Sequence, residues 1–246
     1  MTELPPDWIQ PDWPVSDRVG AFITTRTGGC SRAPYDSMNL GLRVNDDPAA
    51  VQANRALVRR FLPSEPEWLR QIHGTRVVAV DQMSSEQEAD AAVSRTPGVP
   101  CVVMIADCLP VLLAGQSDSV VAVAHAGWRG LAAGVIENTL EAMAIPPASI
   151  AAYLGPAIGP SRFEVGAEVR NAFLEQDASA DAAFTPTVTG KWLADLFLLA
   201  RQRLNRAGVT AIFGGGECTA SNPKRFFSHR RDGVSGRMAA FVWLKE

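Results

Sequence analysis

The hydrophobic residues of this chain fall into short apolar runs divided by polar turns, without one long apolar segment. The runs at 101–105 and 120–124 are apolar at every position, which is typical of strands buried on both faces of a sheet. Apolar or alternating runs predict further strands at residues 19–25, 68–72, 76–80, 111–114, 151–154, 209–213 and 237–244.

Helix signals lie between these runs. Asp47 followed by Pro48 is typical of a helix N-terminus and predicts a helix that continues to about Leu62. Because strands and helices alternate without a strict βαβ order, we expect an α+β, layered α/β fold of mixed β-sheets flanked by helices. Amphipathic spacing predicts the remaining helices at residues 131–143, 165–176 and 192–207.

The length of 246 residues favours one large domain, which we place at 19–246 after an N-terminal extension of residues 1–18. A net charge of −3 and the lack of long basic runs argue against a nucleic-acid partner. No apolar run approaches the length of a membrane span, and the N-terminus carries acid and proline where a signal peptide needs positive charge. We therefore expect a cytoplasmic protein with no membrane partner. In that reducing compartment, free thiols or metal ligands are expected at Cys30, Cys101, Cys108 and Cys218.

Three separate segments end apolar runs with a metal-binding type of side chain: His73 before Gly74, Cys108 after Asp107, and His125 before a glycine-rich turn. The chain has only 3 histidines, and two of them lie in these segments. Imidazole and thiolate are the ligands that zinc prefers, and three protein ligands leave a fourth position for water or substrate. The sequence therefore predicts an open catalytic zinc site formed by His73, Cys108 and His125.

Other polar residues near these segments are candidates for substrate contacts. Arg26 lies in a glycine-rich turn and Arg129 at an expected helix start, and donors beside helix N-termini suit phosphate or another anion. We assign Arg26 and Arg129 to the catalytic group together with Cys108 and His125, and we assign Asn39, Arg55 and Asp107 to substrate binding. For Asp107 two other roles stay open, orienting a ligand histidine or capping its own turn.

These segments together resemble the YfiH/laccase-domain family. The match runs from about residue 19 to the C-terminus, and at His229 the family more often carries an aromatic such as tyrosine. The motifs that carry the resemblance are Thr25-Arg-Thr-Gly-Gly29, Met38-Asn-Leu-Gly41, Asp46-Asp-Pro48, Asn54-Arg55, Gln71-Ile-His-Gly74, Ala106-Asp-Cys-Leu-Pro110, His125-Ala-Gly-Trp-Arg-Gly130, Leu154-Gly-Pro-Ala-Ile-Gly159, Cys218-Thr219, Phe227-Ser-His-Arg-Arg-Asp-Gly233 and Gly236-Arg-Met-Ala239.

The resemblance implies layered mixed sheets and a zinc ion held by His73, Cys108 and His125. It implies a purine nucleoside phosphorylase that acts on adenosine, inosine, guanosine and methylthioadenosine and also deaminates adenosine. The expected partners are thus small molecules, purine nucleosides and phosphate, bound by a monomer or a small homo-oligomer. Family members are also called copper polyphenol oxidases and peptidoglycan editing factors.

These names leave three alternatives. A multicopper oxidase needs many imidazoles, which 3 histidines cannot supply, although Cu²⁺ can compete for a His₂Cys site. Cys108 and His125 could instead form a nucleophile–base pair of a hydrolase or amidase that acts in peptidoglycan precursor editing. A metal-binding module without turnover is the third alternative.

Overall fold

The computed structural model describes residues 3–83, 85–116 and 119–246, so residues 1 and 2 of the expected N-terminal extension lie outside the described part. Its largest sheet has six strands in the order β11-β7-β5-β6-β3-β2. The outer pairs β11–β7 and β2–β3 are parallel, whereas the inner pairs are antiparallel. The strands are β2 (Val77–Ala79), β3 (Ala91–Ser94), β5 (Leu109–Gly115), β6 (Val121–Ala126), β7 (Ile150–Leu154) and β11 (Ala211–Gly214).

Two smaller sheets complete the β-structure of the described residues. An antiparallel sheet in the order β1-β12-β4 consists of β1 (Val19–Ile23), β12 (Met238–Leu244) and β4 (Cys101–Ile105). An antiparallel sheet in the order β8-β10-β9 consists of β8 (Glu164–Gly166), β10 (Lys191–Ala194) and β9 (Phe184–Pro186).

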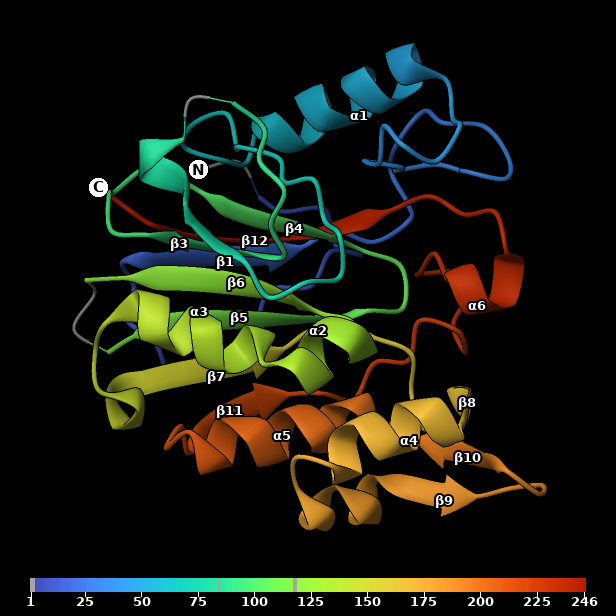
Figure 1. The fold of residues 1–246 in the computed structure, drawn as a ribbon. Helices are drawn as coiled ribbons and strands as arrows, with labels where there is room; N and C mark the ends of the chain where they lie inside the picture. The colour runs from blue at the N-terminus through green and yellow to red at the C-terminus, as the bar shows by residue number, and fades with distance from the viewer. Residues whose placement is uncertain (1–2, 84, 117–118) are drawn as a thin grey trace.

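The α-helices of the described residues are α1 (Pro48–Arg59), α2 (Trp128–Ala133), α3 (Val135–Met143), α4 (Ala167–Leu174), α5 (Leu196–Arg206) and α6 (His229–Asp232). Short 3₁₀ turns occur at Val80–Gln82, Pro147–Ser149 and Ala178–Ala183. Helix α1 lies on one side of the sheets, and α2, α3 and α5 lie on the other (Figure 1). No helix among the described residues has both the length and the apolar composition of a membrane span.

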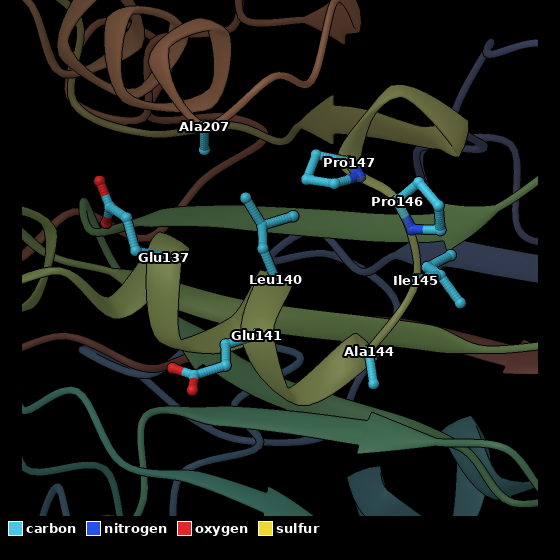
Figure 2. Close-up of a pocket in the computed structure, with 8 residues that line it drawn as sticks. All are labelled: Glu137, Leu140, Glu141, Ala144, Ile145, Pro146, Pro147 and Ala207. Carbon is cyan, nitrogen blue, oxygen red and sulfur yellow. The ribbon is translucent and has the colours of Figure 1, made fainter.

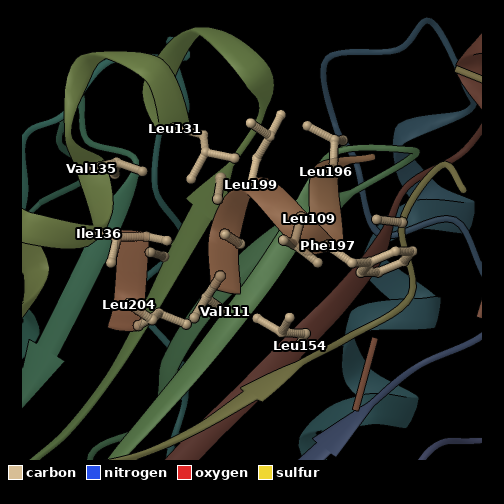
Figure 3. Packing of buried hydrophobic residues seen from close by; sticks show 14 of the residues in the cluster. Leu109, Val111, Leu131, Val135, Ile136, Leu154, Leu196, Phe197, Leu199 and Leu204 are labelled. Atoms are coloured by element: carbon tan, nitrogen blue, oxygen red, sulfur yellow. The ribbon is translucent and has the colours of Figure 1, made fainter. Parts of the chain in front are cut away.

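The six-stranded sheet and the β1-β12-β4 sheet pack face to face, and the alternation of side chains along β6 explains this arrangement. Ala122 and Ala124 of β6 contribute to the core that faces the helices, whereas Val121 and Val123 contribute to the core between the sheets. Figure 3 shows leucines of α5 packed over β5 in the helix-side core. The central strands are therefore buried on both faces, and the expected α+β fold of mixed sheets flanked by helices is confirmed.

Several predicted elements match the structure closely. The run 101–105 is β4 at its predicted bounds. Asp47 caps α1 by accepting a hydrogen bond from the Ala49 backbone N–H, with Pro48 as the first helical residue. Of the expected N-terminal extension, Trp8 is buried and stacks on Phe22 of β1.

Other predicted elements were wrong. The expected helix 131–143 begins earlier, at Trp128, and is divided into α2 and α3 because Gly134 adopts a left-handed conformation with φ 104°. The first residues of the expected helix 192–207 lie in strand β10 (Lys191–Ala194), and α5 starts only after Asp195, whose side chain caps it. The start of the expected helix 165–176 lies in β8.

The expected strand 68–72 is also absent, because Arg70 makes only an isolated bridge with Glu88. Strand β3 was not predicted, although it pairs with both β2 and β6 inside the largest sheet. The residue that precedes it, Asp90, proves to be important for the site.

Candidate metal centre

The structure brings together the side chains of His73, Cys108 and His125, which come from three separate segments. One nitrogen of each imidazole and the Cys108 Sγ all lie within 4.8 Å of one another. The Cys108 Sγ lies 3.8 Å from the His73 Nε2, and the two imidazole rings meet edge to face with centroids 4.9 Å apart. The cluster thus has the convergence that the sequence predicted.

The pairing of β5 with β6 places two of these residues side by side. Pro110 of β5 pairs with His125 of β6, so Cys108 lies just before β5 at the point where the chain after β6 turns into α2. Gly127 stands there without a side chain. A Cβ added at Gly127 would lie 2.9 Å from the Cys108 Sγ and 3.1 Å from the His73 Cδ2. Glycine is therefore needed for the ligands to approach one another.

His73 projects from a turn whose backbone is strained. Its φ is 60°, a left-handed conformation that costs residues other than glycine, asparagine and aspartate about 1–2 kcal/mol. Helix α2 packs tightly against this turn, because a Cβ added at Gly130 of α2 would lie 2.7 Å from the Gly74 carbonyl oxygen. The exposed His73 is thus held by its backbone rather than by burial of its ring.

A fully buried carboxylate, Asp90, lies behind the cluster. Its Oδ1 accepts hydrogen bonds from the His125 Nδ1, at 2.8 Å, and from the His73 backbone N–H, at 2.9 Å. Its Oδ2 accepts from the backbone N–H groups of Ile72 and Gly74. Burial raises the pKa of Asp90, but the hydrogen bonds from His125 and from the backbone outweigh that effect, so the pKa is lowered and the carboxylate stays ionised.

Cys108 and His125 favour one another's charged forms. Burial raises the pKa of the Cys108 thiol, but the neighbouring His125 and His73 more than offset this, and the pKa is lowered. Burial lowers the pKa of His125, but the Cys108 thiolate and Asp90 more than offset this, and the pKa is raised. In the absence of a metal, the protein therefore favours a thiolate beside an imidazolium.

The donor set fits a zinc ion. With bond lengths of about 2.0–2.1 Å to nitrogen and 2.3 Å to sulfur, tetrahedral zinc holds N and S ligands roughly 3.6 Å apart, close to the observed 3.8 Å between Cys108 and His73. Because Asp90 accepts a hydrogen bond from the Nδ1 of His125, the Nε2 of that ring is left to act as the ligand atom. Three ligands leave the fourth position of a tetrahedron open.

Asp107 holds the chain around the cluster rather than a ligand histidine. It has φ 90°, and its buried carboxylate accepts from the Thr219 Oγ1, the Ser228 Oγ and the Arg230 backbone N–H, at 2.5, 3.0 and 2.7 Å. It thereby ties the residue before Cys108 to two C-terminal segments. The carboxylate that contacts a ligand histidine is that of Asp90, which sequence reasoning did not single out.

The two arginines that we assigned to catalysis differ in the contacts that their guanidinium groups make within the protein. Arg26 donates to the backbone oxygens of Asp36 and Pro223, and its Nη2 lies 3.3 Å from the Asp36 carboxylate. Arg129 is exposed on the first turn of α2, and its guanidinium contacts only the Trp128 ring, at 4.4 Å, among the contacts of the described residues. Arg129 therefore retains all its donors for an anion, whereas Arg26 binds two loops together.

The residues assigned to substrate binding make contacts within the protein. Asn39 is fully buried and exchanges hydrogen bonds with Gly41, Asp46 and the Arg237 backbone N–H. Arg55 donates to the Leu40 carbonyl and stacks 3.8 Å from the Trp68 ring centroid, and burial lowers its pKa to about 10. None of these contacts includes a cluster residue, and a substrate role for Asn39, Arg55 and Asp107 stays a prediction.

A further cation near the cluster, Arg237, was also missed by sequence reasoning. It directly precedes β12, whose first residue, Met238, pairs with Ile105 at the end of β4. Burial lowers the pKa of Arg237, and the charges of Cys108 and Asp107 act in the opposite direction, which places the guanidinium within their electrostatic reach. Only the motif Gly236-Arg-Met-Ala239 pointed to this position.

The cluster lies outside two hollows on the surface of the described residues. A cavity of about 440 Å³ lies instead beside the C-terminal end of α3, where Leu140, Ile145 and Pro147 line it together with Glu137 and Glu141 (Figure 2). A second hollow of about 310 Å³ is lined by Arg26, Asp36 and Lys224, among others. Neither hollow is lined by His73, Cys108 or His125.

Comparison with known proteins places this site in a family. The family model described as multi-copper polyphenol oxidoreductase laccase matches residues 20–245. The chain belongs to the YfiH family of laccase-like proteins. It is 52% identical over 241 residues to the purine nucleoside phosphorylase YfiH of Escherichia coli, covering 96% of this chain and 98% of that protein. A Pseudomonas aeruginosa protein named purine nucleoside phosphorylase is 51% identical over 240 residues, covering 97% of this chain and 99% of the relative.

Solved structures of the YfiH family have the same fold. A Neisseria meningitidis protein described by the family name DUF152 superposes with a TM-score of 0.95 at 47% identity, covering 98% of this chain and 100% of that one. The protein YlmD of Geobacillus stearothermophilus superposes with a TM-score of 0.87 at 30% identity, covering 100% of this chain and 98% of that one. The arrangement of mixed sheets and helices around the cluster is thus the family fold.

Proposed function

We propose that this protein is a zinc-dependent purine nucleoside phosphorylase that acts on adenosine, inosine, guanosine and methylthioadenosine and also deaminates adenosine. The convergence of His73, Cys108 and His125 carries the proposal, because it provides a metal-binding donor set with an open position. The names of relatives at 51% and 52% identity supply the reaction.

The three ligand residues would hold zinc, which when bound supplies a Lewis acid for a phosphate oxygen or for a water. The chain itself binds and orients the reactants. Arg129 lies two residues after Gly127, and its guanidinium forms no hydrogen bond or ion pair among the described residues, so we assign it to phosphate. In phosphorolysis a phosphate oxygen forms a bond to the anomeric carbon as the bond to the purine breaks, giving ribose 1-phosphate and free base. The guanidinium balances the negative charge of the attacking group.

The laccase description of the family model has less support from the residues. A multicopper oxidase needs more imidazole ligands than 3 histidines provide, and His229 lies in α6 rather than in the cluster. Cu²⁺ remains an alternative ion for the His₂Cys set, so copper binding alone would not indicate oxidase activity.

Metal analysis beside a phosphate-dependent assay tests the proposal. We expect about one zinc per purified chain, and release of ribose 1-phosphate from inosine only when phosphate is present. Cys108→Ala should lose both the zinc and the phosphorolysis. Cys30→Ser is the matched control, because Cys30 lies away from the cluster beside Asn54 of α1, and it should retain both. Phosphorolysis by metal-free Cys108→Ala protein would reject the proposal.

One observation favours a second candidate function. Asp90, His125 and Cys108 form a carboxylate–imidazole–thiol series, which is also the arrangement of a thiol hydrolase. Such an enzyme would cleave amides, as peptidoglycan precursor editing requires, and would need no metal. Chelation separates the two candidates: a thiol hydrolase keeps its activity in chelator and loses it on alkylation, whereas the zinc enzyme is inactive in chelator.

A further inference from the structure

Asp90 is the residue on which the backbone of one ligand and the ring of another both depend. Its carboxylate accepts hydrogen bonds from three consecutive backbone N–H groups, those of Ile72, His73 and Gly74, at 3.1, 2.9 and 2.7 Å. The same carboxylate accepts from the His125 Nδ1 at 2.8 Å. Every lone-pair direction of this buried group is thus used toward the two ligand segments.

The contact with the 72–74 turn holds His73 in place. His73 has φ 60°, a conformation that the chain adopts only when its surroundings compensate for the strain. Three N–H groups that converge on one anion provide that compensation. Without the carboxylate the turn would relax, and the His73 ring would leave the cluster.

The contact with His125 sets the orientation and the tautomer of its ring. The backbone is fixed as well, because the His125 N–H donates to the Asp90 carbonyl oxygen at 2.7 Å. Because the carboxylate holds a proton on Nδ1, the lone pair of Nε2 is free to bind the same metal ion as the Cys108 Sγ. One residue therefore constrains His125 at both its backbone and its ring.

We infer that Asp90 is the positioning residue of the metal centre, which fixes His73 and His125 in the geometry that binds the ion. This inference rests on the proposed zinc-dependent function. It assigns to a residue outside the ligand set the task of holding two of the three ligands together. Because Asp90 is buried behind the histidines, it acts through them and not on the substrate.

Zinc affinity tests the inference without a turnover assay. We expect Asp90→Asn to bind zinc about 10–100-fold more weakly than the natural protein in competition with a chromophoric chelator, and Asp90→Ala to bind it more weakly still. The matched control is Asp81→Asn, because Asp81 also accepts a backbone N–H and a side-chain hydroxyl, from Arg95 and Thr96, away from the cluster. It should bind zinc as the natural protein does.

The outcomes separate the two proposals. Natural protein that binds no zinc would overturn the proposed function, whereas natural affinity in folded Asp90→Asn protein would overturn only the role of Asp90. Should the Asp90 variants fail to fold, the ¹⁵N–¹H spectrum of the histidine rings in the natural zinc-loaded protein decides. We expect His125 to carry its proton on Nδ1 with Nε2 on the metal, and the opposite tautomer would overturn the inference.

Discussion

Cys108 lies so close to Gly127 that any side chain at position 127 would collide with its sulfur: an added Cβ would lie 2.9 Å from the Sγ. The backbone of Gly127 has φ −62° and ψ 155°, which alanine adopts without strain, so Gly127→Ala introduces a steric change alone. We expect it to displace Cys108 or His73 and to lower zinc affinity at least about tenfold.

The control for this variant is Gly216→Ala, because nothing lies within 4 Å of a Cβ built there. Zinc affinity is measured by chelator competition and folding by thermal denaturation. Equal zinc affinity in Gly127→Ala and Gly216→Ala proteins would mean that the ligands tolerate a wider separation than the structure indicates.

Arg129 and Arg26 should respond differently to truncation. Arg129 makes no hydrogen bond or ion pair with another described residue, so Arg129→Ala should raise the KM for phosphate about tenfold or more and leave the melting temperature unchanged. Arg26 connects Asp36 with Pro223, so Arg26→Ala should lower the melting temperature. The exposed Arg32 provides a control that should change neither value. An unchanged KM for phosphate in Arg129→Ala would remove this residue from the site.

The reactivity of Cys108 in metal-free protein should follow its lowered pKa. The thiolate favoured by His125 and His73 should be alkylated by iodoacetamide well below the ordinary thiol pKa of about 8.5, and the rate should fall only as the pH drops through the lowered value. His125→Gln should move this profile to higher pH. The buried Cys101, whose pKa burial raises, should stay unreactive. Peptide mapping by mass spectrometry measures the alkylation of each cysteine separately. An alkylation rate at Cys108 with the pH dependence of an ordinary thiol would contradict the interaction of Cys108 with His125.

The same pair predicts how stability of the metal-free protein depends on pH. The lowered pKa of Cys108 means that its contribution is lost as the pH falls through that value. The raised pKa of His125 means that its contribution is lost as the pH rises through that value. The free energy of unfolding in urea should therefore be highest between the two, and this maximum should flatten in Cys108→Ala protein.

Asp107 should contribute to stability through its three hydrogen bonds. Asp107→Ala leaves the Thr219, Ser228 and Arg230 donors unpaired and puts alanine at φ 90°, so we expect a loss of about 3 kcal/mol in the free energy of unfolding. Asp107→Asn keeps acceptors and tolerates the backbone, so it should lose roughly half as much. Urea denaturation measures both, and equal stability of the two variants would show that the hydrogen bonds contribute little.

The sequence revealed the parts of the site that carry a local pattern. His73, Cys108 and His125 end apolar runs, and residue type together with position was enough to group them. Asp90 carries no such signal, because a carboxylate before a short strand resembles an ordinary surface residue until β3 pairs with β6 and buries it. Its role exists only in the tertiary structure.

The errors in the predicted secondary structure also arise because tertiary contacts decide the outcome. Strand β10 is short and follows a helix-like apolar spacing, and only its pairing with β8 and β9 makes it a strand. Gly134 lies inside an apolar pattern that continues on both sides of it, so the pattern alone does not show that the helix is divided there. Where burial on both faces fixed the outcome, as in β4, the apolar run gave the correct bounds.

The four hydrogen bonds to Asp90 have a consequence for how the candidate metal centre would exchange a bound ion. Structural zinc modules such as zinc fingers are assembled by the ion itself and come apart when it is withdrawn. In this protein the folded chain has already met the conformational entropy cost of bringing distant residues together. The Asp90 carboxylate holds the segments of His73 and His125 in place without an ion. A metal site that is pre-organised in this way can release and rebind an ion while the surrounding sheets and helices stay folded.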